Sequence, residues 1–515
     1  MNGASLSRRD FLKAGLAGVG GLLLPASGRS QPDLQPPLPN VIVLVFDALS
    51  AMHLSLHGYP RLTTPNIDAF AEQSTVFHAH YSTGNYTTTA TASMFTGTLP
   101  WTHRALNPGG PILAELAHQN PFRILGGRYR SMGFSQNIWA HRHLLQFESD
   151  LGRLLQPASY SLLEEHAALE SGVGDAWLRS VTLNEFLMPL QGEIPPGASL
   201  LAYLNKRAVS REVVPGPAQR YPKGFPEVNN PGYWVPYLNE AVFPGVQGEI
   251  ERLHATGEPY VAYFHLWSPH SPYRARADFR DLFVDGYRPA PKPALHFAKG
   301  QDEAFLVSQR ALYDRQIAQV DAEFGRLVAR LDAIGILEQS YVIITSDHGE
   351  LFERGFVGHG FERMYEPVLR VPLIVHAPGQ RSRVDIHEPT SHVDLLPTMM
   401  SLTGGESVSK PDGYSLPGFG GTAANGRPIF AVYAATNAAR KPLNRRVVAM
   451  RKDDLKLISY EGFPGLDGVV ELYDLARDPE EMTDLAPQTP PELQRLKDEL
   501  TEALAEADRP YRERT

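Results

Sequence analysis

Four short, predominantly apolar runs give the chain its clearest pattern. They cover residues 41–46, 260–267, 341–345 and 371–375. A short apolar run of this kind is typical of a strand that is buried on both faces of a sheet. Helix-like stretches lie between the runs, at 67–73 and at 309–331, where apolar residues recur at helical spacing. Strands that alternate with helices predict an α/β fold, in which helices flank a large, mainly parallel sheet.

Polar side chains gather where the first three runs end. Asp47 follows the first run, the sequence Ser-Pro-His at 268–270 follows the second, and Ser-Asp-His at 346–348 follows the third. The carboxyl ends of parallel strands meet at one edge of a sheet, and functional sites form there. We therefore expect one site that is assembled from segments far apart in the sequence.

The N-terminal segment has a different character from the rest. Residues 1–30 contain two adjacent arginines, Arg8 and Arg9, followed by a short apolar run at 14–24. This pattern is typical of a twin-arginine export signal. The run is shorter than the roughly 20 residues that a spanning helix needs. We therefore expect export to the periplasm or the cell exterior, with no stable membrane insertion beyond the signal.

The remaining chain divides into two predicted parts. Residues 31–403 carry the α/β pattern, with an insertion at about 151–253 that is rich in Pro, Gly and aromatic residues. Residues 404–515 show short strand-like runs and then a helical stretch at 491–507. The second part is therefore expected to be a smaller C-terminal α+β subdomain.

Composition excludes several classes of partner and site. The chain has 515 residues, a formal net charge of −9 and no long basic run, so we expect no nucleic-acid partner. It contains no cysteine, which excludes disulfides and thiolate metal sites.

Short motifs also follow one another in a regular order along the chain. They are Thr64-Pro65-Asn66-Ile67-Asp68, Pro269-His270-Ser271-Pro272-Tyr273, Thr345-Ser346-Asp347-His348-Gly349-Glu350, Gly358-His359-Gly360, Arg370-Val371-Pro372-Leu373-Ile374 and Leu472-Tyr473-Asp474-Leu475. In order and spacing they resemble the sulfatase family of the alkaline-phosphatase superfamily. The resemblance implies a sulfatase-like catalytic domain at 31–403 and a metal-dependent hydrolase of ester bonds.

The same resemblance implies a metal site at Asp47, Asp347 and His348. Family members end the first strand in two aspartates, and Ala48 replaces the second one here. Two carboxylates, an imidazole and a hydroxyl oxygen suit Zn²⁺ or Mn²⁺, with Ca²⁺ or Mg²⁺ as the alternatives. Gly349 permits a turn that lets Asp347 and His348 both face the site. The alternative interpretation is a strand-to-helix turn capped by Asp347.

A threonine-rich segment resembles the family's nucleophile segment, which reads Cys-x-Pro-Ser-Arg a few residues before a Thr-Gly. Counting back from Thr96-Gly97 places Thr87 at the cysteine and Thr91 at the arginine. A threonine hydroxyl becomes a usable nucleophile beside a divalent cation, so Thr87 is expected to be both a metal ligand and the nucleophile. The alternative interpretation is a Thr/Ser-rich turn that caps the next helix.

Three histidines complete the candidate catalytic set. His270 and His359 lie near two points where the related phosphoethanolamine transferases carry a histidine that binds metal or contacts the transferred group. His143 matches a family active-site histidine if Ala140-His141-Arg142-His143 is aligned with Gly-Lys-Trp-His. Each of them has a plainer interpretation as a buried structural histidine.

The departures from the family pattern point in one direction. The chain lacks the cysteine that becomes formylglycine, the arginine that holds it and the second opening aspartate. Together they resemble the threonine-nucleophile branch of the superfamily. The first hypothesis is therefore an exported hydrolase of phosphoric or phosphonic esters, acting on a small-molecule, lipid or glycan ester. The alternatives are a sulfuric ester hydrolase without formylglycine, a phosphoryl-group transferase, and a non-catalytic binding protein on this scaffold.

Overall fold

A central eight-stranded sheet organises the molecule, as seen in a computed structural model that describes residues 38–160, 238–294, 300–405, 411–422 and 426–512. The expected export signal at 1–30 therefore lies outside the described residues. The strand order is β11-β2-β10-β7-β1-β6-β4-β5. The strands are β1 (Asn40–Phe46), β2 (Thr75–Phe77), β4 (Arg130–Ser135), β5 (Arg153–Leu154), β6 (Tyr260–Leu266), β7 (Ser340–Ser346), β10 (Leu373–His376) and β11 (Val384–Ile386). In this sheet β10 runs antiparallel to both of its neighbours, and the other pairs are parallel.

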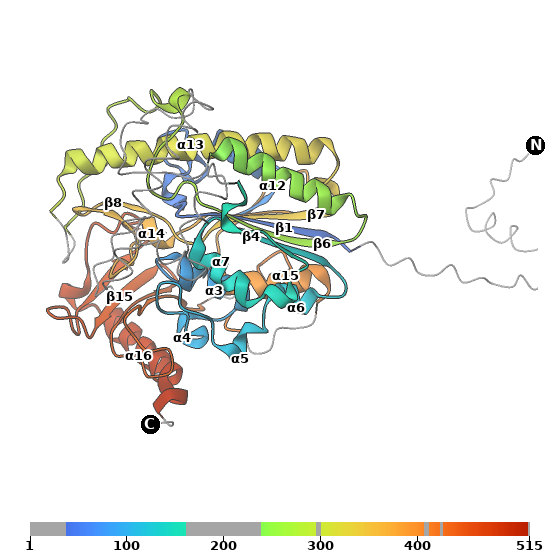
Figure 1. The fold of residues 1–515 in the computed structure, drawn as a ribbon. Helices are drawn as coiled ribbons and strands as arrows, with labels where there is room; N and C mark the ends of the chain where they lie inside the picture. The colour runs from blue at the N-terminus through green and yellow to red at the C-terminus, as the bar shows by residue number, and fades with distance from the viewer. Residues whose placement is uncertain (1–37, 161–237, 295–299, 406–410, 423–425, 513–515) are drawn as a thin grey trace, which may run out of the picture. The chain divides into compact units, whose positions relative to one another are not determined.

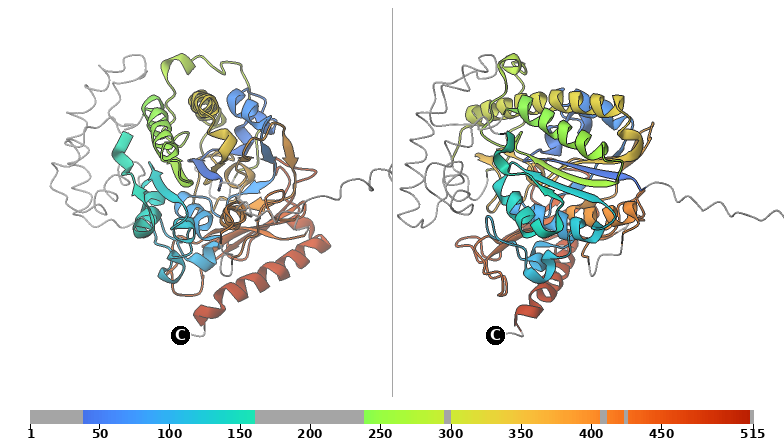
Figure 2. Two further views of the ribbon diagram at one scale, coloured as in Figure 1. Left: turned by 90° about the vertical axis from the view of Figure 1, so that its right-hand side faces the viewer. Right: turned by 45° about the vertical axis from the view of Figure 1, so that its right-hand side comes forward.

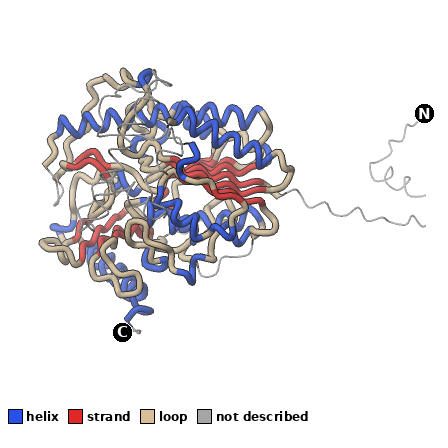
Figure 3. Tube along the Cα trace, in the orientation of Figure 1, coloured by secondary structure: helices blue, strands red, loops and turns tan. Residues whose placement is uncertain are grey.

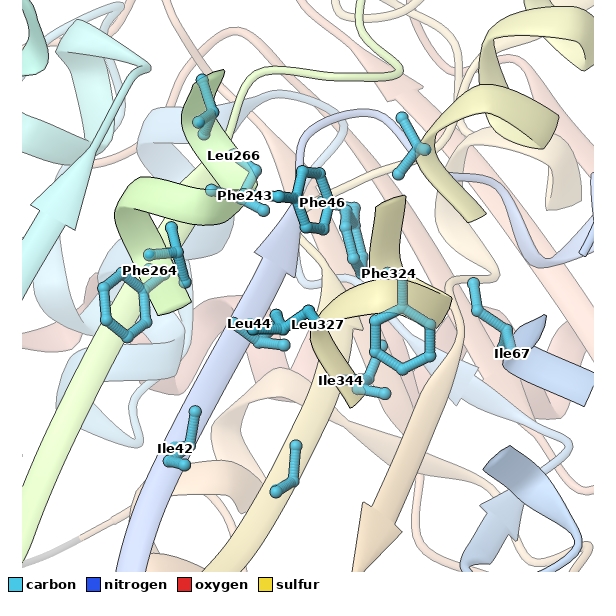
Figure 4. Close-up of a cluster of buried hydrophobic side chains, with 14 of the residues drawn as sticks. Ile42, Leu44, Phe46, Ile67, Phe243, Phe264, Leu266, Phe324, Leu327 and Ile344 are labelled. Carbon is cyan, nitrogen blue, oxygen red and sulfur yellow. The ribbon is translucent and has the colours of Figure 1, made fainter. Parts of the chain in front are cut away.

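The four apolar runs are the four adjacent strands β10, β7, β1 and β6, so the predicted α/β fold is confirmed. Strand β1 shows why they are apolar throughout, because all of its residues are buried. Ile42, Leu44 and Phe46 face one core cluster, and the alternate residues Val41 and Val43 face another. Figure 4 shows the first cluster around β1. A fully buried side chain of this type contributes about 1.5–3 kcal/mol.

Helices cover both faces of this sheet (Figures 1 and 3). The first cluster packs under α2 (Pro65–Ala71), α12 (Asn239–His254) and α13 (Glu303–Ala333). The second packs under α3 (Thr87–Thr96), α6 (Pro121–Leu125), α7 (Ile138–Gln146) and α15 (Leu395–Thr403). The helices expected at 67–73 and 309–331 are α2 and α13. Helix α13 begins six residues earlier than its apolar pattern, because Asp302 accepts a capping hydrogen bond from the backbone of Phe305.

The insertion expected at about 151–253 overlaps this layered core. Residues 161–237 of that range lie outside the described part of the chain. Residues 239–254 form α12, whose Val242, Phe243 and Val246 are buried in the first cluster, where the Phe243 ring stacks on Phe46. The C-terminal end of the expected insertion is therefore a helix that covers the sheet.

The C-terminal part is a smaller α+β unit, as predicted. Its antiparallel sheet has the order β13-β14-β15-β16, with β13 (Ile429–Tyr433), β14 (Arg446–Lys452), β15 (Leu455–Glu461) and β16 (Val470–Asp474). Helix α16 (Pro491–Arg512) covers one face of this sheet through leucines at positions 493, 496, 500 and 504. The described residues from Pro39 onward form one compact unit, and both views of Figure 2 show α16, in red, at the lower edge.

Shorter elements connect these layers. They are β3 (His80–Tyr81) with β12 (Thr390–Ser391), β8 (Leu351–Glu353) with β9 (Phe356–Gly358), α4 (Pro100–His103), α5 (Ala114–Ala117) and α14 (Glu366–Leu369). Across the described ranges, no helix has the length and apolar character needed to cross a membrane.

Candidate functional site

Three adjacent strands bring two carboxylates and an imidazole together at the carboxyl edge of the sheet. Asp47 follows β1, Asp347 follows β7, and His265 lies near the end of β6. All three are fully buried. His265 Nε2 lies 3.4 Å from Asp47 Oδ2 and 3.6 Å from Asp347 Oδ2. The expected meeting of distant segments therefore occurs, with His265 as a member that the sequence analysis did not identify.

The turns that follow β1 and β7 fix the Asp347 carboxylate. Its Oδ1 accepts hydrogen bonds from the backbone N–H of Ala48 at 3.1 Å and of His348 at 2.9 Å. Ala48 has a φ of 61°, in the left-handed region that alanine rarely adopts. Oδ1 is thus occupied by backbone donors, while Oδ2 is directed toward the other site atoms.

The structure gives Gly349 a role other than the backbone turn that the sequence suggested. Its backbone N–H donates to the Val368 carbonyl at 2.7 Å. A Cβ at this position would lie 2.0 Å from the carbonyl oxygen of Pro367. Close approach of helix α14, and not a left-handed backbone, therefore excludes a side chain here.

Thr87 is the first residue of α3, and its hydroxyl faces the site. Its Oγ1 accepts a hydrogen bond from Asn137 Nδ2 at 3.0 Å and lies 3.5 Å from His348 Nε2. The side chain is 3% exposed. The unpaired N–H groups at a helix N-terminus carry a partial positive charge, which favours negative charge on an oxygen placed there.

The neighbouring threonine hydroxyls are engaged elsewhere. Thr88 Oγ1 accepts from the Gly109 N–H at 2.9 Å, and Thr89 Oγ1 donates to the Ala105 carbonyl at 3.3 Å. Thr91 Oγ1 donates to the Thr87 carbonyl at 2.7 Å, as a hydroxyl inside a helix commonly does. Among these four threonines, the contacts to Asn137 and His348 belong to Thr87.

Asn137 connects the nucleophile position to the carboxylate cluster. It is the N-cap of α7, and its Oδ1 accepts from the Trp139 N–H at 2.8 Å. Its Nδ2 donates to Asp47 Oδ2 at 2.5 Å and to Thr87 Oγ1 at 3.0 Å. The sequence analysis missed this residue, although it stands just after the end of β4, where a site residue is expected.

His143 does not take the place that its sequence alignment suggested. It is fully buried, and its Nε2 donates to the backbone carbonyl of Thr88 at 2.9 Å. Burial lowers the pKa of His143 to about 4, so the ring is neutral. Its contacts brace helix α3, and on the same helix Ser93 Oγ lies 3.0 Å from His103 Nε2.

Three imidazole rings form a cluster that begins at His348, beside Thr87. The ring centroids of His348 and His359 are 4.2 Å apart, and those of His270 and His359 are 4.9 Å apart. In each ring Nδ1 has a partner: the Gly349 carbonyl for His348 at 2.9 Å and the Ser271 carbonyl for His270 at 2.7 Å. Burial lowers the pKa of His348, so a proton on its Nδ1 leaves Nε2 with a free lone pair.

His359 is paired with a buried carboxylate. Its Nδ1 lies 2.8 Å from Oε1 of Glu350, which is fully buried. Burial lowers the pKa of His359, but the charge and hydrogen bond of Glu350 outweigh it, so the pKa is raised above its ordinary value. A carboxylate that orients an imidazole in this way also increases its basicity.

A backbone connection holds the His359 segment next to the segment that carries Thr87. The Gly360 N–H donates to the Asn85 carbonyl at 2.8 Å. Asn85 Nδ2 in turn donates to the carbonyls of Phe361 and Arg363 at 2.7 and 2.9 Å. The predicted residues Thr87, His270, His348 and His359 therefore belong to one side-chain cluster with Asp47 and Asp347.

Charge complementarity dominates the carboxylate cluster. Burial would raise the pKa of Asp47, but His270, His265 and His348 hold it below its ordinary value. For His265, burial lowers the pKa, because it disfavours the charged ring. The carboxylates of Asp47 and Asp347 more than compensate, so the pKa of His265 is raised above its ordinary value. A proton on His265 and a cation held by these atoms therefore compete for the same position.

The donor set fits a divalent cation. Asp47 Oδ1, Asp347 Oδ2 and His265 Nε2 are buried and have no hydrogen-bond partner among the residues that the structure describes. His348 Nε2 lies 3.5 Å from Asp347 Oδ2 and 3.7 Å from Asp47 Oδ1. Ligands about 2.1 Å from a tetrahedral ion lie about 3.4 Å apart, close to these separations. Mixed oxygen and imidazole donors suit Zn²⁺ or Mn²⁺ better than Ca²⁺ or Mg²⁺.

Comparison with known proteins agrees with this geometry. A family model described as Sulfatase matches residues 39–162 and 196–405. A second model, described as N-sulphoglucosamine sulphohydrolase, C-terminal, matches residues 353–509. The choline-sulfatase of Rhizobium meliloti (strain 1021) is 24% identical over 472 residues, covering 87% of this chain and 82% of that protein.

Solved structures with the same fold include a phosphonate monoester hydrolase and a protein bound to a sulfated sugar substrate. The phosphonate monoester hydrolase of Agrobacterium radiobacter has a TM-score of 0.66 at 22% identity, covering 91% of this chain and 95% of its own. The structure of BT4656 in complex with its substrate D-glucosamine-2-N,6-O-disulfate has a TM-score of 0.64 at 17% identity, covering 92% and 98%.

Proposed function

Because the chain belongs to the sulfatase family and is a hydrolase that acts on ester bonds, we propose that it cleaves phosphoric or phosphonic esters with Thr87 as nucleophile. The observation that carries the proposal is the position of the Thr87 hydroxyl. It lies at a helix N-terminus, between Asn137 Nδ2 and His348 Nε2, while its neighbours' hydroxyls are bonded elsewhere. With no cysteine in the chain, formylglycine cannot form from the usual precursor at this position.

Asp47, Asp347, His265 and His348 would hold the divalent cation, with the Thr87 hydroxyl beside them. When bound there, the cation supplies Lewis-acid stabilisation of negative charge on oxygen and makes a neighbouring hydroxyl more acidic. The N-terminus of α3 favours the same charge on Thr87 Oγ. Asn137 donates to this oxygen and so leaves its remaining lone pair free to react.

In the first step, the Thr87 hydroxyl releases its proton to water, and Thr87 Oγ forms a bond to phosphorus while the bond from phosphorus to the ester oxygen breaks. The products are a phosphothreonine and an alkoxide, which takes a proton as it leaves. His359 is suited to supply that proton, because Glu350 favours its protonated form and orients its ring.

In the second step, water attacks the phosphothreonine, and the bond from phosphorus to Thr87 Oγ breaks as phosphate or phosphonate leaves. The Thr87 oxygen then regains its proton from water. His270 is suited to accept the proton of this water. The Ser271 carbonyl is bonded to its Nδ1, so Nε2 is the ring atom left to take this proton.

Sulfuric ester hydrolysis is the second candidate function. The likeness to choline-sulfatase and the family models support it. It would require the Thr87 hydroxyl to attack sulfur without the formylglycine hydrate. The natural substrate in either case is expected to be a small-molecule or glycan ester.

The test compares substrates on the metal-loaded protein. The panel contains 4-nitrophenyl phosphate, bis-4-nitrophenyl phosphate, a 4-nitrophenyl phosphonate monoester and 4-nitrophenyl sulfate. We expect kcat/KM for at least one phosphorus ester to exceed that for the sulfate ester. A higher value for the sulfate ester would overturn the proposal and favour the second candidate.

The nucleophile is tested with Thr87→Ala and the matched control Thr88→Ala. Thr87→Ala should lower kcat by about 10³-fold or more, because no oxygen remains to form the covalent bond. Thr88→Ala removes one hydrogen bond to the Gly109 N–H and should keep activity within about tenfold. Acid quench and mass spectrometry should locate the added phosphoryl group on the peptide that contains Thr87. Full activity in Thr87→Ala would exclude the assignment.

We also propose export by the twin-arginine route, based on Arg8 and Arg9 and the apolar run after them. Cell fractionation should find the protein outside the cytoplasm, and the Arg8→Lys/Arg9→Lys double variant should remain inside. An unchanged distribution of the double variant would contradict this route.

A further inference from the structure

A large aromatic side chain lies exposed beside the candidate site. Phe361 follows His359 by two residues and is 48% exposed. Its φ of 56° is in the left-handed region, which bulky side chains rarely adopt and which is over-represented at functional sites. Asn85 Nδ2 donates to the Phe361 carbonyl at 2.7 Å, and Asn85 stands two residues before Thr87. The backbone of Phe361 is thus fixed to the segment that carries the nucleophile.

Two tyrosines continue from Phe361 toward the nucleophile. The ring centroids of Phe361 and Tyr433 are 6.4 Å apart at 53°, and those of Tyr433 and Tyr86 are 6.1 Å apart at 76°. Tilted rings at these distances are the arrangement that aromatic side chains prefer. Tyr86 immediately precedes Thr87, and Tyr433 ends strand β13 of the C-terminal subdomain. The three rings form an aromatic row from the exposed rim to the nucleophile segment.

A buried arginine lies beside this rim. The guanidinium carbon of Arg363 lies 5.4 Å from the Phe361 ring centroid and 3.5 Å from that of Phe356. Arg363 is 4% exposed, so its charge is weakly screened by solvent. The neighbouring Glu362 carboxylate offsets the positive charge of this guanidinium. The exposed ring of Phe361 therefore suits a neutral, planar, apolar group.

We propose that Phe361 contacts the aryl group of an aryl-bearing substrate and thereby sets specificity for the apolar substituent next to the reacting group. The proposal rests on the proposed function, because it takes the reacting group to lie between Thr87 and His359. Stacking against Phe361 would bury apolar area on both rings, and the fixed backbone means that little is lost in ordering the side chain.

The experiment measures binding and needs no turnover. Calorimetry on the Zn²⁺-loaded protein compares phenylphosphonate with methylphosphonate, which share the anionic group and differ in the apolar one. Phe361→Ala should weaken phenylphosphonate about tenfold and change methylphosphonate by less than about twofold. Phe361→Leu, which keeps apolar bulk without the ring, should fall between. Phe305→Ala is the matched control, because Phe305 is 42% exposed on α13, and it should change neither ligand.

Equal weakening of both phosphonates would show that Phe361 supports the His359 segment instead of the substrate, and would overturn the proposal. An unchanged ratio in Phe361→Ala would overturn it as well. The same ratio is measured with benzenesulfonate and methanesulfonate. If the protein binds and turns over sulfur compounds only, the phosphoric-ester function fails, while the phenyl-to-methyl ratio still decides the role of Phe361.

Discussion

At the scale of single residues, Asn137 is a group that does not react itself but whose two hydrogen bonds fix its position in the site. One amide nitrogen donates to both Asp47 Oδ2 and Thr87 Oγ1, so it sets the distance between the carboxylate and the hydroxyl. Replacing it with alanine removes both bonds and leaves Thr87 free to rotate. We expect Asn137→Ala to lower kcat by about tenfold to hundredfold, with bound metal largely retained.

Steady-state kinetics and metal analysis on the same preparation check this prediction. The control is Gln136→Ala. Gln136 directly precedes Asn137, but its side chain accepts a hydrogen bond from the backbone N–H of Trp267, just after β6. Gln136→Ala should change KM and kcat less than Asn137→Ala does. If Asn137→Ala lost its metal along with its activity, Asn137 would act on the cation site and not on Thr87.

His265 offers a residue-scale test of the metal site itself. Its Nε2 faces both carboxylates, and its loss would leave them buried with one fewer neutralising partner. After dialysis, we expect His265→Gln to hold at most about one tenth of the Zn²⁺ that the wild-type protein holds, measured by elemental analysis. Losing a group around a metal typically weakens metal binding by about tenfold or more. His376→Gln is the matched control: His376 is equally buried, but on β10 with its Nδ1 at the Gln73 carbonyl. Equal metal content in the two variants would remove His265 from the site.

These two residues also mark the limit of sequence reasoning at this scale. Asp47, Asp347 and His348 could be predicted, because a polar residue directly after an apolar strand stands out. His265 sits inside the apolar run of β6 and was read as part of a buried strand. Asn137 was missed because alignment on histidines favoured His143, whose neutral ring packs against the Thr88 carbonyl instead. Only the packing of β4 beside β6 reveals which polar group reaches Thr87.

At the scale of elements, the turn after β7 depends on the approach of α14. Gly349→Ala would place a Cβ 2.0 Å from the Pro367 carbonyl, a backbone atom that can move only if the helix moves. We expect destabilisation of about 1–3 kcal/mol, measured by denaturant unfolding, together with reduced activity. Gly248→Ala is the control, because it lies inside α12 with no atom within 4 Å of the added Cβ. It should be neutral or stabilising by about 0.5–1 kcal/mol. Equal stability of the two variants would refute this account.

Elements were predictable where burial and pattern agreed. The strands β10, β7, β1 and β6 read as apolar runs because helices cover both sides of them. Helix α12 was not recognised, since Pro244, Gly245 and Gly248 interrupt its sequence. Packing of Val242, Phe243 and Val246 on the sheet outweighs their unfavourable helix propensity, which a local pattern cannot show.

At the scale of the whole molecule, a buried ion cluster joins the catalytic and C-terminal parts. Lys456 Nζ on β15 lies 3.0 Å from Glu366 Oε1 on α14 and 2.7 Å from Glu481 Oε1. All three side chains are at most 4% exposed. Lys456→Met would leave the two buried carboxylates facing each other without the ammonium group that bonds to both. Breaking a buried pair in this way costs about 3–5 kcal/mol. We therefore expect a large loss of stability that affects both parts at once.

Calorimetry separates this expectation from a local effect. Because Glu366 and Lys456 belong to different parts of one compact unit, the wild-type protein should unfold in one transition, and Lys456→Met should lower that transition as a whole. Lys452→Met is the matched control on the neighbouring strand β14. Its partner Glu499 is 27% exposed, so the loss should stay below about 1 kcal/mol. A separate early transition of the C-terminal subdomain in Lys456→Met would mean that the two parts fold independently. Tyr433 would then belong to a subdomain that can unfold while the catalytic part stays folded. Because Tyr433 packs against Phe361, ligand binding would then be lost at that first transition.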